Sequence, residues 1–222
     1  MKTSSFIFLS FLLTSCSSLD FERIAPNYAE AYRSIKGYAL GFEDNLISRE
    51  LVDKIPYASM KLSVGKGSAG LLILEESNDE TLTYLSADGI RFVINKGVII
   101  RTSGFENNLT FRLEPANSIR NFLDSGKKEI EYLVYHSYDE PKLINLKLKT
   151  RLKRMQLEMH EILGEKYQLL RVEQTLENEY LGWKKINTYW LDQKDYFVWK
   201  SKQNISPLLP EIQYEVTKKP AE

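Results

Sequence analysis

The sequence predicts a mostly β protein, in which a strongly curved antiparallel sheet forms an open or half-closed barrel with short helices near the N-terminus. Apolar and polar residues alternate with a period of two in many short segments, which is typical of strands with one buried face. Turn-forming residue pairs separate these segments by only a few residues, too few for the crossovers that join parallel strands. With 222 residues, 43% of them hydrophobic, the chain is long enough to form one sizeable core.

The first fifteen residues have the features of a secretory signal peptide. Lys2 provides a positive n-region, residues 6–13 form an apolar stretch broken only by Ser10, and Ser15 is a small residue before a cleavage site. Cys16, the only cysteine in the chain, follows directly, and its thiol resembles the lipid acceptor of a bacterial lipobox. Because the apolar stretch is far shorter than the roughly 20 residues of a membrane-spanning helix, we expect cleavage before Cys16 and lipidation of its thiol.

The predicted organisation is a signal peptide over residues 1–15, a lipidated cysteine with a short tether over residues 16–26, and a single β-rich domain over residues 27–222. The mature chain would carry 29 basic against 30 acidic residues, since cleavage removes only Lys2. This balance gives no electrostatic reason to expect a nucleic-acid partner or a polybasic contact with acidic lipids. We expect the lipid to anchor the domain to the outer membrane, facing the periplasm, because Ser17 rather than an aspartate follows the anchor.

Two short helices are expected before the strands. In the first, Asn27 is a suitable N-cap, apolar residues recur at helical spacing over residues 28–35, and Gly37 can end the helix. The second begins at Ser48 and stops before Pro56.

From residue 58 onward the pattern changes to strands joined by tight turns. The first group of expected strands covers residues 58–64, 70–74, 82–86, 90–94 and 98–102. Asp88 followed by Gly89 is the strongest turn signal in this group, because both residues tolerate the positive φ that a type I′ hairpin turn requires. A catalytic carboxylate is the alternative role for Asp88, but a tight turn explains this residue pair on backbone grounds alone.

A second group of strands is expected over residues 129–135, 143–159, 167–172, 183–191, 196–201 and 213–216. In the segment 143–159, leucines at even positions alternate with basic residues at odd positions from 147 to 153. The apolar positions change from even to odd near Arg154, which indicates a β-bulge in one long bent strand. We interpret the basic residues as a solvated strand face; the alternative is a stripe that binds anions or polysaccharide.

The chain beyond residue 55 resembles the YjbF/GfcB family of bacterial lipoproteins. The resemblance rests on short motifs in the family's order and spacing behind a lipobox, and it covers nearly the whole mature chain. The motif residues are Ile55, Pro56, Tyr57, Ala58 and Ser59; Ser86, Ala87, Asp88 and Gly89; Arg101, Thr102 and Gly104; Asn187, Tyr189 and Trp190; and Val198, Trp199, Ser201, Gln203, Ile205, Ser206 and Pro207.

The resemblance implies an outer-membrane lipoprotein that is accessory to exopolysaccharide or group 4 capsule secretion. The implied partners are an outer-membrane β-barrel protein and periplasmic polysaccharide-export proteins, and the exopolysaccharide itself is a further candidate ligand. The resemblance implies neither an enzyme nor a cofactor.

The residues agree with a non-enzymatic role. The sequence lacks the nucleophile-elbow, phosphate-loop and zinc-protease motifs, and its only histidines are His136 and His160. His160 is close to Glu158 and Glu161 in sequence, but a surface histidine beside solvated acids is the commoner arrangement, so we assign no catalytic and no metal-binding residues. A glycan-processing enzyme stays as the less favoured alternative, because a glycoside hydrolase needs only two well-placed carboxylates.

Aromatic residues concentrate in the C-terminal part of the chain, where they could stack on sugar rings or anchor a partner protein. The candidate binding surface consists of Trp183, Tyr189, Trp190, Tyr196 and Trp199. Burial in the core is the alternative for most of these side chains, with one or two left at the surface.

The predicted architecture also looks like the LolA/LolB-type carrier fold. That likeness supplies an alternative function, a lipid or lipoprotein carrier whose concave face holds acyl chains. A carrier needs an accessible apolar pocket of roughly several hundred Å³, whereas a secretion accessory needs an exposed surface for its partner.

Overall fold

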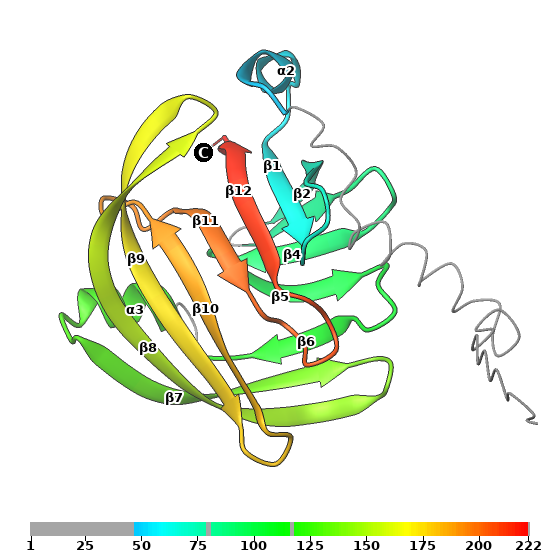
Figure 1. Cartoon of the computed structure of the whole chain (residues 1–222), viewed down its shortest axis with the longest axis vertical. Coiled ribbons are helices and arrows are strands. Elements are labelled where there is room, and N and C mark those ends of the chain that lie inside the picture. Colours follow the sequence, from blue (N-terminus) through cyan, green and yellow to red (C-terminus); the bar gives the residue numbers. More distant parts are fainter. Residues whose placement is uncertain (1–46, 79–80, 116–117, 222) are drawn as a thin grey trace, which may run out of the picture.

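The computed structural model describes residues 47–78, 81–115 and 118–221. These residues form twelve strands and two helices (Figure 1). In chain order the elements are α2 (Arg49–Lys54), β1 (Ser59–Val64), β2 (Gly70–Asn78), β3 (Thr81–Leu85), β4 (Arg91–Asn95), β5 (Val98–Ser103), β6 (Leu109–Leu113), α3 (Ser118–Asp124), β7 (Glu129–Tyr138), β8 (Leu143–Ile162), β9 (Glu165–Asn178), β10 (Trp183–Leu191), β11 (Val198–Gln203) and β12 (Ile212–Lys218).

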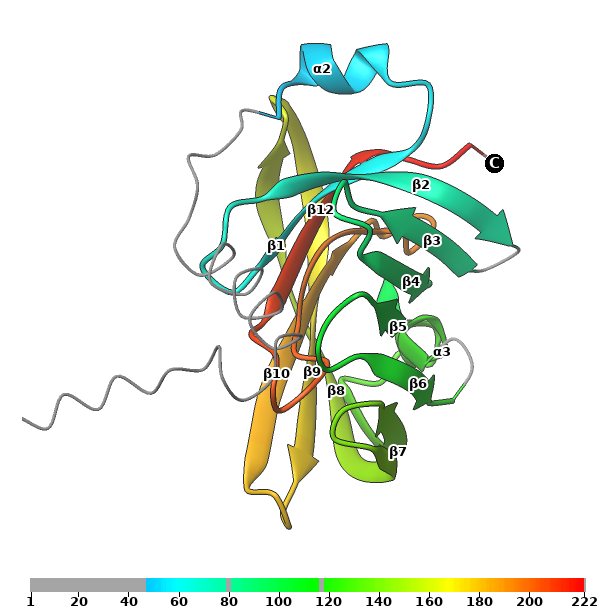
Figure 2. The same cartoon turned by 90° about the vertical axis from the view of Figure 1, so that its right-hand side faces the viewer.

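All twelve strands belong to one antiparallel sheet that is nearly closed into a barrel (Figures 1 and 2). β1 pairs with β12, and the sheet extends from this pair in two arms, one from β2 to β5 and the other from β11 back to β6. The arms end at β5 and β6, which lie next to each other without a shared strand ladder. The predicted fold, a mostly β protein with a strongly curved antiparallel sheet in a half-closed barrel, is confirmed.

The core lies inside the curved sheet and is built from alternate residues of the strands. In β1, Met60, Leu62 and Val64 are buried, and they pair across the sheet with residues of β12 that include the buried Tyr214 and Val216. Because the period of two places every second side chain on the inner face, the polar residues between them point outward.

The predicted helix from Ser48 to Pro56 is confirmed by α2. The hydroxyl of Ser48 accepts a hydrogen bond from the backbone N–H of Leu51 at 3.2 Å, which caps the helix, and the helix ends at Lys54. The predicted helix that begins at Asn27 lies outside the described residues. Strand β6 and helix α3 were not predicted. Within the described residues, neither helix has the length and apolar character needed to cross a membrane.

The type I′ geometry predicted for Asp88 and Gly89 is wrong. Gly89 has a φ of 85°, but Asp88 does not have a positive φ. The N–H of Gly89 donates to the carbonyl of Ser86 at 3.1 Å, and the N–H of Ser86 donates to the carbonyl of Ile90 at 2.9 Å. These bonds form a three-residue loop in which only the glycine is left-handed. The Ser86 hydroxyl also donates to the Asp88 carboxylate, so Asp88 has a role within the turn.

Two consecutive positive φ values occur instead in two other hairpins. Lys96 and Gly97, between β4 and β5, have φ values of 46° and 87°, and Leu163 and Gly164, between β8 and β9, have values of 47° and 86°. Both pairs are two-residue connections of the kind that matches the twist of antiparallel strands.

The bulge predicted near Arg154 is present. The register of β8 against β9 shifts between Arg154 and Leu157. Beyond the shift, however, Leu157 and Met159 are 40% and 63% exposed, whereas Glu158 and His160 are half-buried against β10. The tip of the long hairpin curves over the end of the barrel toward β12 (Figure 1), and the apolar face expected beyond the bulge is left exposed.

Candidate functional site

The hairpin turn between β4 and β5 folds into the barrel and is held there by β11 and β12. The carbonyl of Gly97 accepts hydrogen bonds from the side-chain amide of Gln203 in β11 at 2.9 Å and from the hydroxyl of Tyr214 in β12 at 2.7 Å. The amide oxygen of Gln203 also accepts a bond from the N–H of Ile99 at 3.0 Å. A single buried amide therefore holds both Gly97 of the turn and Ile99 at the start of β5.

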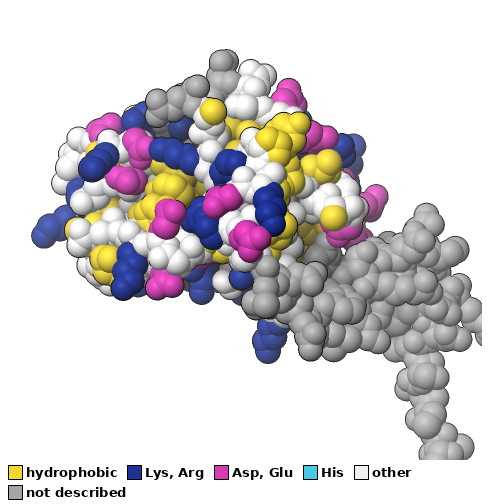
Figure 3. Space-filling model, turned by 90° about the horizontal axis from the view of Figure 1, so that it is seen from above, with side chains coloured by type: hydrophobic (Ala, Val, Ile, Leu, Met, Phe, Trp, Pro, Cys, Tyr) yellow, Lys and Arg dark blue, Asp and Glu magenta, His cyan; other side chains and the backbone are white. Residues whose placement is uncertain are grey.

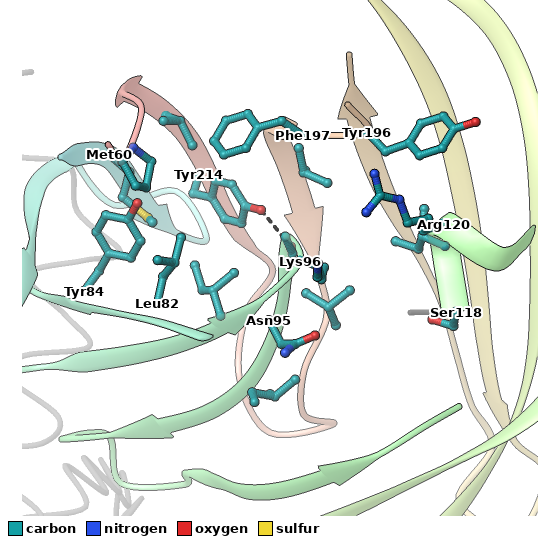
Figure 4. A pocket seen from close by; sticks show the side chains of 18 of the residues that line it. Met60, Leu82, Tyr84, Asn95, Lys96, Ser118, Arg120, Tyr196, Phe197 and Tyr214 are labelled. Carbon is teal, nitrogen blue, oxygen red and sulfur yellow. Dashed lines mark hydrogen bonds between the residues drawn. The ribbon is translucent and has the colours of Figure 1, made fainter. Parts of the chain in front are cut away.

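Next to this turn the barrel encloses a cavity of about 610 Å³ (Figure 4). Its inner wall is mostly apolar and buried, and includes Met60, Tyr84, Ile94, Val98, Tyr214 and Val216. Half-buried Leu82 and Ile100 extend the wall toward the opening. The core therefore does not fill the concave face of the sheet.

Charged side chains surround the opening of the cavity. Lys96, Arg120, Asp195 and Lys219 line it and are exposed. The Lys219 ammonium lies 2.5 Å from the Asp195 carboxylate and 4.6 Å from the centre of the Phe197 ring. Figure 3 shows the end of the molecule that carries α2, where basic and acidic side chains are interspersed with exposed hydrophobic ones.

A buried polar network occupies the part of the barrel between β6, β9 and β10. The guanidinium of Arg112, whose side chain is fully buried, donates to the Glu114 carboxylate at 2.7 Å and to the amide oxygen of Gln174 at 3.0 Å. The same amide oxygen accepts bonds from the Tyr189 hydroxyl at 2.9 Å and the Asn187 amide at 3.2 Å. Burial alone would lower the pKa of Arg112, but the Glu114 carboxylate raises it above its ordinary value, so the guanidinium stays charged.

His136 lies opposite Arg112 across the β6–β7 ladder. Its Nδ1 is 3.0 Å from the Tyr138 hydroxyl, which itself donates to the carbonyl of Ile205 at 2.9 Å, so Nδ1 carries the proton. Burial and repulsion from Arg112 lower the pKa of His136 well below its ordinary value, which keeps the ring neutral. Arg112 Nη1 and His136 Nε2 have no hydrogen-bond partner within the described part of the protein.

The five predicted binding aromatics divide between the interior and the surface. Tyr189 is fully buried, and Trp183 and Trp190 are 7% and 8% exposed. Tyr196 and Trp199 are half-buried, so they are the accessible members of the predicted surface. The Trp199 ring lies 4.5 Å from that of Tyr167 and 5.1 Å from that of Phe197, measured between ring centres. We call these three rings the Trp199 cluster.

Trp190 and His160 meet at the carboxylate of Glu158. The Trp190 indole donates to Glu158 at 2.7 Å, the Arg171 guanidinium donates at 3.0 Å, and His160 Nε2 lies 3.5 Å away. The bond from Trp190, supported by Arg171, holds the pKa of the Glu158 carboxyl below its usual range. Among the described residues, no group of three or more histidine, cysteine, aspartate or glutamate side chains is placed to hold a metal ion.

The basic residues of β8 form an exposed outer face, as predicted. Lys149 lies 2.5 Å from Glu179, and Arg151 lies 2.9 Å from Glu131. Because acidic residues of β7 and of the β9–β10 turn balance these charges, the arrangement favours a solvated strand face over an anion-binding stripe.

A model of a protein family described as group 4 capsule polysaccharide lipoprotein GfcB, YjbF matches residues 32–216, which is most of the chain. The chain belongs to the YjbF family. Its structure is also similar to the crystal structure of the hypothetical lipoprotein YmcC from Escherichia coli K12, with a TM-score of 0.68 and 19% sequence identity. The similarity covers 88% of this chain and 96% of YmcC, and at this identity it shows the shared fold. A search of curated proteins found no significant match.

Many of the residues on which the predicted family resemblance rests are buried. Gln203 holds the β4–β5 turn, and Thr102 accepts a bond from the N–H of Leu109 at 3.0 Å, across the gap between β5 and β6. Asn187 accepts a bond from the N–H of Asn204 at 2.7 Å and connects it to Gln174. These motif residues therefore position the strands that enclose the cavity. Arg112, Glu114 and Gln174 belong to the same interior, but no sequence motif indicated them.

Proposed function

We propose that this YjbF-family chain is a lipoprotein of the outer membrane, facing the periplasm, that assists the export of an exopolysaccharide or capsular polysaccharide by binding. The observation that carries the proposal is the family match over residues 32–216. The binding partner is an outer-membrane β-barrel or periplasmic protein of the export apparatus, or the polysaccharide itself. The signal-peptide pattern that ends at Cys16 supports attachment to the membrane by lipid.

The Trp199 cluster is the proposed contact surface for that partner. It combines three adjacent rings with Lys219, which lies over the Phe197 ring and pairs with Asp195. Aromatic residues fixed by their neighbours lose little conformational entropy when a partner docks, and such residues dominate the binding energy of protein interfaces.

The alternative function, a lipid carrier, is supported by the cavity of about 610 Å³. We rank it second because acylation at Cys16 would hold the domain at the membrane. The tether from Cys16 to Pro26 spans at most about 35 Å when fully extended, so a domain anchored in this way could hold a lipid at the membrane but could not transport it across the periplasm.

The first prediction concerns the anchor. Cys16→Ser removes the thiol that accepts the lipid, and we expect the variant to leave the outer-membrane fraction, because one uncleaved apolar segment of this length is too short to span the bilayer. Separation of inner and outer membranes on a density gradient, followed by immunodetection, measures the distribution. Ser17→Ala is the matched control and should stay in the outer membrane. Full retention of Cys16→Ser there would contradict lipid anchoring.

The second prediction concerns the partner. Trp199→Ala should weaken partner binding by about 1–3 kcal/mol, a loss of roughly 5-fold to 150-fold in affinity, because it removes the central ring of the Trp199 cluster. Crosslinking in membranes followed by purification of the chain measures the recovery of export proteins, and polysaccharide output is measured in the same strains.

The matched control for this variant is Tyr180→Ala, since Tyr180 is 94% exposed in the turn between β9 and β10. It should leave both recovery and output unchanged, and thermal unfolding of both variants should show intact folds. If purified chain hydrolysed the exported polysaccharide and a single carboxylate substitution abolished that activity, the binding function would be replaced by an enzymatic one.

A further inference from the structure

We propose that the cavity inside the barrel binds the hydrocarbon chain of an anionic lipid, with the lipid head group held at the charged opening. This inference goes beyond the proposed function, which does not require the interior of the barrel, although Asp195, Phe197 and Lys219 of the proposed contact surface also line the cavity opening. It is carried by three features of the cavity: its apolar wall, the charge around its opening and an unpaired hydroxyl in its wall.

The wall is suited to a hydrocarbon chain. Six buried wall residues, contributed by β1, β3, β4, β5 and β12, present mainly apolar atoms, and Leu82 and Ile100 continue this surface outward. A volume of about 610 Å³ lies within the range of roughly 300–1,000 Å³ that is typical of small-molecule sites. Figure 4 shows Leu82 and Tyr84 on one side of the space and Arg120 of α3 on the other. A ligand that displaced water from this wall would gain hydrophobic free energy along its whole chain.

The opening carries basic side chains. Among the described residues that line it, Lys219 pairs with Asp195, whereas Arg120 is exposed and stands over the Tyr196 ring at 5.6 Å. Arg112 and Glu114 neutralise each other inside the barrel at 2.7 Å. Arg120 is therefore the cation at the rim that can meet an anionic head group. A carboxylate or phosphate head group would complement this charge.

A buried hydroxyl in the wall also lacks a partner. Tyr84 is 1% exposed and lines the cavity, yet its hydroxyl has no hydrogen-bond partner within the described part of the protein. Buried hydroxyls are normally paired, because an unpaired one loses its bonds to water without replacement. The ester oxygen of a phospholipid, which lies between the head group and the hydrocarbon chain, would be able to accept this hydrogen bond.

The test uses the full lipidated chain reconstituted in phosphatidylcholine vesicles. The probe is palmitate with a photoactivatable diazirine near the end of its chain, and mass spectrometry of proteolytic peptides locates the labelled residues. We expect labelling to concentrate on inward-facing residues of β3, β4 and β12. A second arm carries the same diazirine chain in phosphatidylglycerol within the vesicle, so that a free fatty acid and a membrane phospholipid are distinguished as sources.

Filling the cavity should displace the probe. Leu82→Trp places a larger side chain in the wall and should reduce labelling about tenfold, and Ile100→Trp is a second filling variant in case the first does not fold. The matched control is Leu133→Trp, because Leu133 is 39% exposed and points outward from β7. The control should retain full labelling. Equal labelling of Leu82→Trp and Leu133→Trp, or labelling spread over the outer face, would overturn the proposal.

The head group is tested with the methyl ester of the same probe and with Arg120→Gln. The methyl ester removes the charge of the probe and Arg120→Gln removes the charge of the rim, so each should lower labelling roughly threefold. Because both changes break the same contact, labelling of Arg120→Gln by the ester should be no lower than with either change alone. Stronger labelling by the ester would overturn the anionic assignment. Partner recovery is measured separately. If the chain binds its partner but not the probe, this inference is wrong and the proposed function stands. If the chain binds the probe but no partner, the proposed function is wrong and this inference stands.

Discussion

Gly97→Ala is expected to lower the free energy of unfolding by about 3–5 kcal/mol, a large share of the stability of a typical domain. Gly97 has a φ of 87°, and a Cβ atom at this position would lie 2.3 Å from Cγ2 and 2.4 Å from Cβ of Val198. Since neither the backbone conformation nor the space admits a methyl group, the turn would withdraw from the barrel. Its carbonyl would then lose the hydrogen bonds from Gln203 and Tyr214.

The structure offers a close control for this variant. Gly164 occupies the equivalent position of the β8–β9 turn, with a φ of 86°, but a Cβ atom there would meet nothing within 4 Å. Gly164→Ala should therefore lose only the backbone contribution, about 1–2 kcal/mol. Urea denaturation followed by tryptophan fluorescence measures both values. Equal losses would show that the β4–β5 turn is not held inside the barrel.

The parts of the fold that depend on local sequence were predictable. Alternation of apolar and polar residues located most strands, and the change of phase near Arg154 located the bulge, because both follow from the two-residue period of a strand. Strand ends were less accurate. The sequence predicts a strand that begins at Tyr196, but this residue has a φ of 58° and lies before the start of β11 at Val198. A tyrosine gives no local signal of that conformation.

Strand β6 shows where hydropathy fails. Phe111 and Leu113 are 46% and 52% exposed, whereas Arg112 between them is 6% exposed. Hydropathy would place Phe111 and Leu113 inside the barrel and Arg112 outside it, the opposite of what the structure shows. Arg112 is stable inside because Glu114 and Gln174 pair with it, and Gln174 lies 62 residues further along the chain. The interior of the barrel therefore depends on long-range pairing that the local pattern does not contain.

Long-range pairing also limited the prediction of the candidate site. Trp190 and Trp199 look equivalent in the sequence, but pairing of β10 with β9 buries Trp190 against Glu158, while Trp199 stays accessible beside Tyr167. The cavity arises from the approach of the β4–β5 turn to β11 and β12, elements about a hundred residues apart. The spacing of residues in the sequence predicts neither the contact of Trp190 with Glu158 nor that of the β4–β5 turn with β11 and β12.

Arg112→Met is expected to destabilise the protein by about 3–5 kcal/mol, because it leaves a mostly buried carboxylate without its cation. The side chains of Arg112 and Glu114 are 0% and 13% exposed. Without Arg112, the Glu114 carboxylate would retain, among the described residues, only the bond from the Ser118 hydroxyl at 3.2 Å. Urea denaturation of the variant measures the loss.

A double-mutant cycle separates the unpaired charge from the lost packing. Adding Glu114→Gln to Arg112→Met removes that charge and should restore roughly 1–3 kcal/mol. Lys149→Met is the control, since Lys149 pairs with Glu179 at 2.5 Å but both side chains are largely exposed, and it should change stability little. If Arg112→Met and Lys149→Met were equally mild, the buried pair would not stabilise the barrel. Gln and Glu have nearly the same shape, so Glu114→Gln changes the charge and keeps the packing. If the double variant were less stable than Arg112→Met, lost packing rather than the unpaired charge would explain the destabilisation by Arg112→Met.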